Sequence, residues 1–226
     1  MKAGIVGLPN VGKSTLFNCL SNTKAQSANF PFCTIEPNHS IINVPDKRLI
    51  TLQEIVNPEK LIPATVEIVD IAGLVKGASK GEGLGNKFLA NIRETDAIIH
   101  VLRCFDNDNI THVDGSVDPI RDKEIIDIEL QLKDLESLNN RLEKVSRTVK
   151  SGDKEAAREK EVLNQAISFI ESSNNIRSID LDEDDINKYL KPLQLITSKP
   201  VLYVCNVDER SVCLLYTSPS PRDQVV

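Results

Sequence analysis

The segment Gly7–Thr15, with the sequence GLPNVGKST, constrains the fold more than any other part of the chain. Its spacing, G-x-x-x-x-G-K-[ST], is that of a P-loop, in which backbone N–H groups surround the phosphates of a nucleotide. An apolar strand-like run at 3–6 precedes the loop, and a helix-forming stretch at 13–20 follows it, so the helix N-terminus is directed at the anion. The chain is therefore predicted to bind a nucleoside triphosphate.

The P-loop residues have separate expected roles. Lys13 is expected to reach the β- and γ-phosphate oxygens and, together with Mg²⁺, to offset their negative charge during hydrolysis. The Ser14 hydroxyl is expected to bind Mg²⁺. The predicted nucleotide-binding residues of this loop are Asn10, Val11, Gly12, Lys13, Ser14 and Thr15.

Composition narrows the class of protein. The 226 residues are 40% hydrophobic and 27% charged, and no apolar run approaches 18 residues, so we expect no membrane span and a cytoplasmic location. A net charge of -6 argues against a uniformly basic nucleic-acid surface and leaves room only for a local patch, so we expect no direct DNA binding. We also expect a monomer. Five cysteines without a C-x-x-C pair favour small buried side chains over a zinc site or a redox role.

The pattern of apolar runs predicts an α/β fold. Runs that are apolar on both faces and alternate with helical segments indicate a mostly parallel, doubly wound sheet covered on both sides. The predicted strands are 3–6, 40–44, 66–69, 97–102 and 201–205. A long interruption separates the last of these from the others.

Two helices are expected within that interruption. In 121–149, apolar residues recur at alternating spacings of three and four, which is typical of a coiled-coil seam. This seam consists of Ile125, Ile128, Leu132, Leu135, Leu138, Leu142, Val145 and Val149. A second helix is predicted for 154–171, so the pair should form an antiparallel helical hairpin inserted into the sheet domain.

These patterns give an expected domain organisation. The nucleotide-binding domain comprises 1–120 together with 197–210 and is incomplete, and the inserted helical coiled-coil domain comprises 121–196. The tail at 211–226 is rich in Ser and Pro and lacks apolar periodicity, so it is expected to be disordered. It also resembles translated sequencing-adaptor read-through, which would make it non-native.

Further along the chain are candidate groups for magnesium and the γ-phosphate. Asp70 begins a DxxG pattern directly after a predicted strand, where it would hold the magnesium shell while the Gly73 N–H touches the γ-phosphate. Thr34 lies in a long loop and is the candidate for a second hydroxyl ligand, with an ordinary loop threonine as the alternative. The predicted metal ligands are Ser14, Thr34 and Asp70. Several glycines after Asp70 favour a nucleotide-dependent switch.

Four segments together resemble the Obg-like ATPase family, specifically its YchF branch. They are Gly7–Thr15, Asn29–Asn38, Asp70–Gly85 and Asn206–Glu209. The resemblance implies a Ras-like or Obg-like P-loop domain with an inserted hairpin, Mg²⁺-dependent ATP hydrolysis, and the large ribosomal subunit as partner. Family members continue through the rest of the nucleotide domain into a C-terminal TGS domain, and by this resemblance we expect the TGS domain to be absent here.

The row Asn206-Val207-Asp208-Glu209 stands where guanine-specific switch proteins have N-K-x-D. Val207 removes the lysine that packs on the base, and Glu209 places its carboxylate one methylene further out. Asn206, Val207 and Glu209 are therefore predicted to favour ATP over GTP, and the resemblance implies the same preference. A guanine-specific GTPase remains a rival hypothesis, as does an acidic strand end with no role in base choice.

The group that orients the attacking water is the least constrained part of the prediction. Leu74 occupies the place of the glutamine that Ras-like proteins use, so we take His112, in a polar loop, as the candidate base. An exposed loop histidine without a catalytic role is the alternative. A potassium ion held by Asn10 is a second hypothesis. A nucleotide-gated adaptor protein with little turnover remains an open alternative. A small-molecule kinase is disfavoured, because no arginine-rich lid follows the P-loop in the sequence.

Overall fold

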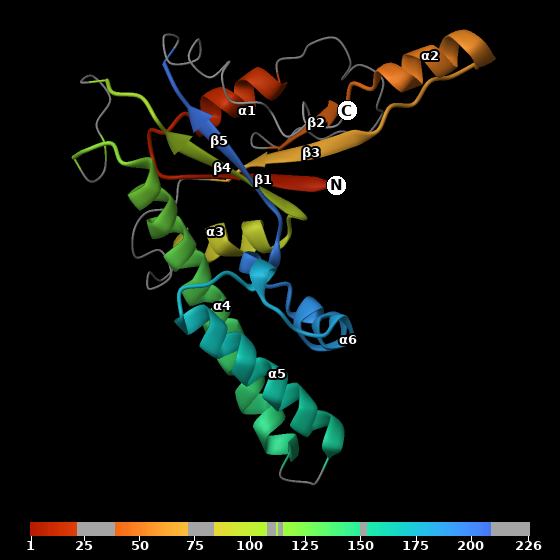
Figure 1. Cartoon of the computed structure of the whole chain (residues 1–226). Coiled ribbons are helices and arrows are strands. Elements are labelled where there is room, and N and C mark those ends of the chain that lie inside the picture. The colour runs from red at the N-terminus through yellow and green to blue at the C-terminus, as the bar shows by residue number, and fades with distance from the viewer. Residues whose placement is uncertain (22–38, 72–83, 108–111, 113–114, 150–152, 209–226) are drawn as a thin grey trace.

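The structure is a computed structural model that describes residues 1–21, 39–71, 84–107, 112, 115–149 and 153–208. For 84–88 it describes the backbone alone. The described residues form a five-stranded sheet with helices beside it and a long helical hairpin that extends away from it (Figure 1).

The sheet has the strand order β2-β3-β1-β4-β5. Its strands are β1 (Lys2–Val6), β2 (His39–Asn43), β3 (Thr65–Asp70), β4 (Ala97–Arg103) and β5 (Val201–Asn206). β2 pairs antiparallel to β3 at one edge, and the other three pairs are parallel. The predicted mostly parallel sheet is confirmed, with each predicted strand within a residue or two of its observed bounds.

The two central strands are buried on both faces because helices cover them. Four of the five residues of β1 and six of the seven of β4 are buried, as expected for apolar runs inside a doubly wound sheet. Helices α1 (Lys13–Ser21) and α3 (Leu84–Arg93) follow β1 and β3 in the chain. Together these elements enclose a core that includes Ile5, Phe17, Val69 and Ile98.

Helix α2 (Lys47–Val56) connects β2 with β3 and lies at the far end of these two strands (Figure 1). Asp46 begins it as N-cap by accepting a hydrogen bond from the Arg48 N–H at 2.9 Å. None of the ten residues of α2 is buried, and Ile55 is 74% exposed. This helix therefore adds nothing to the sheet core.

The hairpin consists of α4 (Pro119–Val149) and α5 (Lys154–Glu171), which run side by side away from the sheet (Figure 1). Both predicted helices are confirmed. Asp153 caps α5 by accepting from the Glu155 N–H at 2.9 Å. Short helical turns lead back to β5, namely Ile176–Ser178, α6 (Glu183–Asp185), Ile186–Leu190, Lys191–Leu193 and Ile196–Ser198.

The predicted seam of α4 is wrong in its first half and confirmed in its second. Ile128 is 51% exposed and Leu132 is 38% exposed, while Ile126 and Leu130 are buried in the sheet core instead. The reason is that α4 has two partners: its first half packs on the sheet domain through a different face, and only its second half meets α5. There Leu135, Leu138, Leu142, Val145 and Val149 form a second core with the buried face of α5.

Asp134 of α4 ties the hairpin to the segment before β5. Its side chain is fully buried and accepts hydrogen bonds from the Ile196 N–H at 2.9 Å and from both the N–H and the hydroxyl of Thr197 at 2.7 Å. Burial raises the pKa of this carboxyl group, and the three hydrogen bonds oppose that rise. The contact therefore fixes where the chain leaves the hairpin and re-enters the sheet.

The substitution Asp134→Ala should destabilise the protein by about 3–5 kcal/mol, because three buried donors lose their acceptor. Denaturant unfolding measures the loss. Glu136→Ala is a control on the same helix: that side chain is 53% exposed and pairs with Lys133, so its removal should change stability by less than about 0.5 kcal/mol. Equal effects of the two substitutions would contradict the structural role of Asp134.

Candidate functional site

The P-loop lies at the carboxyl end of β1, between that strand and α1 (Figure 1). Lys13, only 7% exposed, donates a hydrogen bond from Nζ to the Leu8 carbonyl at 2.7 Å, so its side chain lies over its own loop. Burial lowers the pKa of Lys13, and the nearby Asp70 carboxylate opposes that change. The Lys13 ammonium is thus held beside the loop that is expected to bind the phosphates.

Close contacts with β4 and β5 explain two of the P-loop glycines. A Cβ at Gly7 would lie 2.6 Å from the Val101 carbonyl oxygen, and a Cβ at Gly12 would lie 2.5 Å from Asn206 Nδ2. Gly12 also has φ +100°, a conformation that residues with a side chain rarely adopt. The motif needs glycine here because neighbouring strands approach the loop closely.

Ser14 and Asp70 meet as predicted for a magnesium site. The Ser14 hydroxyl donates to Asp70 Oδ2 at 3.0 Å, although 56 residues separate the two in sequence. Asp70 Oδ1 is buried and, within the described part of the chain, has no hydrogen-bond partner. An unsatisfied buried carboxylate oxygen beside a hydroxyl suits a hard cation that keeps several of its own waters, so these residues fit Mg²⁺.

Asn206 at the end of β5 reaches the P-loop directly. Its side-chain Nδ2 donates to the Val11 carbonyl at 2.9 Å, and its backbone carbonyl accepts from the Cys104 N–H at 2.8 Å. The first residue of the predicted base-recognition row is therefore in contact with the phosphate loop. Val207 follows it at the same edge of the sheet.

His112 is buried rather than exposed, so the alternative of an exposed loop histidine is wrong. Its Nε2 lies 2.9 Å from Asp122 Oδ2, and the two side chains are 5% and 2% exposed. Asp122 belongs to the first turn of α4. A catalytic role for His112 stays a prediction, but the residue is part of a buried side-chain contact with Asp122.

His100 is the other buried histidine of the sheet region. It lies in β4 next to the Tyr203 ring, with the ring centroids 5.5 Å apart. Burial lowers its pKa to about 4, so the ring is neutral at physiological pH. It packs in the core and does not belong to the phosphate site.

Three residues of the predicted site lie outside the described residues, namely Thr34, Gly73 and Glu209. Leu74, which stands in place of the glutamine, also lies outside them. The tail at 211–226 also lies outside them. The structure brings together the loop from Asn10 to Thr15 with Asp70 and Asn206, and it places His112 against α4.

Two residues were missed by the sequence analysis. Asp122 could not be linked to His112, because an acidic residue in a helical sequence gives no sign of which side chain it will contact. Arg103 at the end of β4 is only 2% exposed, and its guanidinium donates to the carbonyls of Phe105 at 3.1 Å and Asn107 at 3.2 Å. A charged residue after an apolar strand carries no signal that distinguishes it from a surface arginine.

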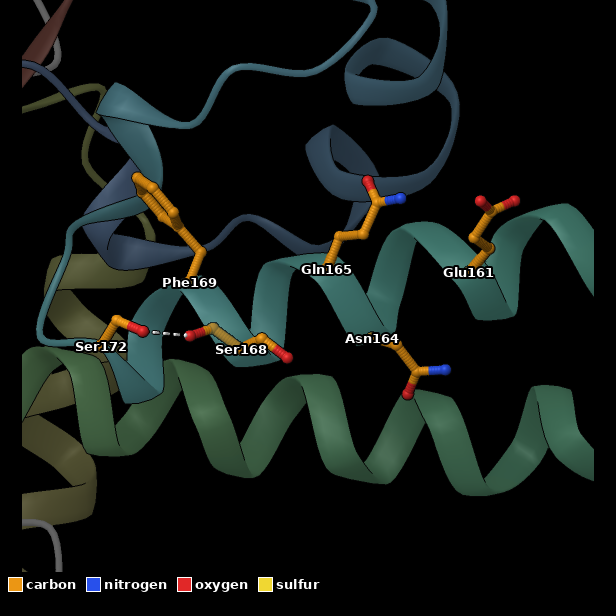
Figure 2. A pocket seen from close by; sticks show the side chains of 6 residues that line it. All are labelled: Glu161, Asn164, Gln165, Ser168, Phe169 and Ser172. Atoms are coloured by element: carbon orange, nitrogen blue, oxygen red, sulfur yellow. Dashed lines mark hydrogen bonds between the residues drawn. The ribbon is translucent and has the colours of Figure 1, made fainter.

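A separate open hollow lies on α5, away from the P-loop. Figure 2 shows that its lining side chains come from this one helix and its C-cap, and that Ser172 Oγ donates to the Ser168 carbonyl, at 2.9 Å. The lining residues are Glu161, Asn164, Gln165, Ser168, Phe169 and Ser172. It shares no residue with the phosphate site.

The substitution Gly12→Ala should weaken nucleotide binding by at least about tenfold, because the added methyl group would displace Asn206 from the P-loop. Titration with a fluorescent nucleotide measures the affinity. Gly115→Ala is the matched control: Gly115 also has positive φ, at +76°, but a Cβ there meets nothing within 4 Å. It should cost some stability through backbone strain and leave affinity unchanged. Equal affinities for the two variants would contradict the contact-based explanation.

Comparisons with known proteins agree with these observations. The chain is 56% identical over 212 residues to "Ribosome-binding ATPase YchF" of Bacillus subtilis and 55% identical over 210 residues to the protein of the same name from Haemophilus ducreyi. These alignments cover 94% and 93% of this chain and 58% of each relative, so the chain spans little more than half their length.

A solved structure and a family model give the same assignment. The "Structure of the Schizosaccharomyces pombe YchF GTPase" superposes with a TM-score of 0.79 at 40% identity, covering 94% of this chain and 58% of that one. Among the described residues, no helix has the length and apolar character needed to cross a membrane. The resemblance to the YchF branch is confirmed. Because the model described as "50S ribosome-binding GTPase" matches residues 2–140, more than half of the sequence, the chain belongs to that family.

Proposed function

We propose that this chain is a magnesium-dependent P-loop switch that hydrolyses ATP, in preference to GTP, to ADP and phosphate. The observation that carries the proposal is the contact of Ser14 with Asp70, whose second carboxylate oxygen is buried and unsatisfied within the described part of the chain, next to the buried Lys13. A triphosphate with its cation complements all three groups. Relatives named ribosome-binding ATPases support the proposal.

Ser14 and Asp70 would hold the magnesium ion, with Thr34 as the third predicted ligand. When bound, Mg²⁺ neutralises charge on the β- and γ-phosphates as the terminal bond breaks. Lys13 supplies a second positive charge at the same oxygens, and Gly73 is proposed to contact the γ-phosphate. Oxygen ligands from only a few side chains suit Mg²⁺, because the phosphates and water complete its shell.

Base choice is proposed to rest on Val207 and Glu209 rather than on Asn206. One N–H of the Asn206 side-chain amide donates to the Val11 carbonyl. The other can donate to N7 of the base, an acceptor that adenine and guanine share. In a guanine-specific site, an aspartate accepts two hydrogen bonds from guanine, one from N1–H and one from the exocyclic amine. Glu209 is one methylene longer, so its carboxylate would not be placed to accept both. The preference for ATP follows from the loss of the guanine-selective groups.

The double substitution Val207→Lys with Glu209→Asp should therefore shift the ratio of ATP to GTP affinities toward GTP by about tenfold or more. Competition between fluorescent ATP and GTP analogues measures the ratio. Leu202→Lys, on an exposed residue of β5, adds the same charge outside the row and should leave the ratio unchanged. Tighter binding of GTP than ATP by the unsubstituted chain would favour the guanine-specific rival.

His112 is proposed to accept a proton from the attacking water, because Leu74 stands where Ras-like proteins use glutamine. His112 follows β4 in the chain, and the Val101 carbonyl of that strand closely approaches Gly7 of the P-loop. A potassium ion held by Asn10 is the alternative means of stabilising the negative charge on the phosphates. The backbone of Asn10 has φ 62°.

The substitution His112→Ala should lower kcat by about 10²–10⁴-fold and leave ATP affinity unchanged, since the base acts only in the chemical step. Phosphate release in saturating Mg²⁺ measures turnover, and adding EDTA should abolish it. Repetition in sodium instead of potassium tests the second hypothesis. If the unsubstituted chain binds ATP but releases phosphate only at background, the adaptor function is correct and the hydrolase is not.

The ribosome, through its large subunit, is proposed as the partner that reads the nucleotide state. The names of the relatives and of the family support this. The hairpin of α4 and α5 is the proposed contact element because it extends away from the sheet (Figure 1). We further propose a cytoplasmic monomer that does not bind DNA directly, with a nucleotide domain of 1–120 and 197–210 and an inserted domain of 121–196.

A further inference from the structure

We propose that Arg103 is a positioning residue for nucleotide binding: its buried guanidinium fixes the chain where β4 ends, and that end holds Asn206 against the P-loop. This inference rests on the proposed role of Asn206 at the nucleotide. It adds a residue that belongs to no nucleotide-binding motif to the groups that determine the affinity of the site.

Arg103 is a buried cation at the end of a mostly apolar strand. β4 has the sequence AIIHVLR, and its last side chain is almost completely shielded from solvent. Burying a guanidinium is costly even when its donors are satisfied, and a packed apolar side chain of similar volume often stabilises a protein more. The arginine is therefore better explained by what it positions than by a contribution to stability.

The guanidinium fixes the segment that follows β4. Its Nε donates to the Phe105 carbonyl at 3.1 Å, and its Nη2 donates to the Asn107 carbonyl at 3.2 Å. Its Cζ also lies 4.8 Å from the centre of the Phe105 ring. A guanidinium presents its donors in a rigid planar fork, so two carbonyls held by it keep a fixed position relative to the strand. Arg103 thus sets the path of residues 104–107.

The end of β4 in turn holds the end of β5. Arg103 pairs with Asn206 in the parallel register, and the next residue, Cys104, donates its N–H to the Asn206 backbone carbonyl at 2.8 Å. Within the described residues β5 is an edge strand, so its backbone pairs with β4 on one side alone. A shift of residues 103–104 would therefore pass directly to Asn206.

Asn206 has little room to shift without disturbing the P-loop. Its side-chain Nδ2 donates to the Val11 carbonyl at 2.9 Å, and the same atom would lie only 2.5 Å from a Cβ at Gly12. Movement away from the loop would lose the hydrogen bond, which depends steeply on geometry, and movement toward the loop would press on its backbone. The shape of the phosphate loop thus depends on the strand end that Arg103 fixes.

The substitution Arg103→Met tests the proposal, because methionine is apolar and lacks the donors. ATP affinity should fall by about fivefold or more, as measured by titration with a fluorescent ATP analogue. Arg103→Lys keeps the charge but not the planar fork, so it should cause a smaller loss. Arg158→Met is the matched control: it removes an arginine that pairs with Asp185 in the helical insertion, so it should lower stability and leave ATP affinity unchanged.

A double-mutant cycle separates positioning through Asn206 from a general structural role. Asn206→Ala alone should weaken ATP binding. Adding Arg103→Met to it should weaken binding by less than about a further twofold, because the contact through which Arg103 acts is already absent. Losses that simply multiply in the double variant would overturn the positioning role.

The outcomes also separate this inference from the proposed function. If Asn206→Ala leaves ATP affinity unchanged, the proposed role of Asn206 fails and this inference fails with it. If Asn206→Ala weakens binding and Arg103→Met does not, the role of Arg103 is overturned alone.

A measurement on the unsubstituted chain tests the proposal even if the variants do not fold. Because coupling between two sites is reciprocal, ATP with Mg²⁺ should slow the exchange of the Arg103 Nε–H with water. In ¹⁵N NMR this slowing should exceed that of the buried Thr197 N–H, which Asp134 holds away from the P-loop and which reports general stabilisation. Equal slowing at the two positions would overturn the proposal.

Discussion

The parallel alignment of β1 with β3 and β4, and of β4 with β5, is the constraint on which the rest of the structure depends. In this register Ile5 lies beside Asp70, Val6 beside His100, and Arg103 beside Asn206. Parallel strands have their carboxyl ends at one edge of the sheet, so the segments that follow them converge there. The P-loop, Asp70 and Asn206 meet for this reason, although they are far apart in sequence.

Helix α4 belongs to both cores of the molecule. Its first half contributes Ile126 and Leu130 to the sheet core, and its second half contributes Leu138 and Val145 to the core shared with α5. At 31 residues, with a rise of about 1.5 Å per residue, it links the end of the hairpin to Asp122 without a break.

The residues near the site differ in how far the sequence specified them. Ser14, Asp70 and Asn206 carry motif signals because phosphate and base chemistry demand these residue types at these spacings. Asp122 and Arg103 carry none, since neither residue type at its position indicates which buried groups its side chain will contact. The error at Ile128 and Leu132 has a similar origin: alternating three- and four-residue spacing marks an apolar stripe, but it does not say which stripe meets which partner.

By itself, the sequence determined that the chain carries a P-loop, that its sheet is mostly parallel, and that a helical hairpin interrupts it. These features follow from local spacing and from apolar periodicity, which short segments carry on their own. Only the tertiary structure decided that Gly12 must accommodate Asn206, that Asp134 holds the hairpin to the segment before β5, and that His112 is paired with Asp122. Each of these contacts joins segments whose distance depends on the whole fold, so no local pattern could encode it.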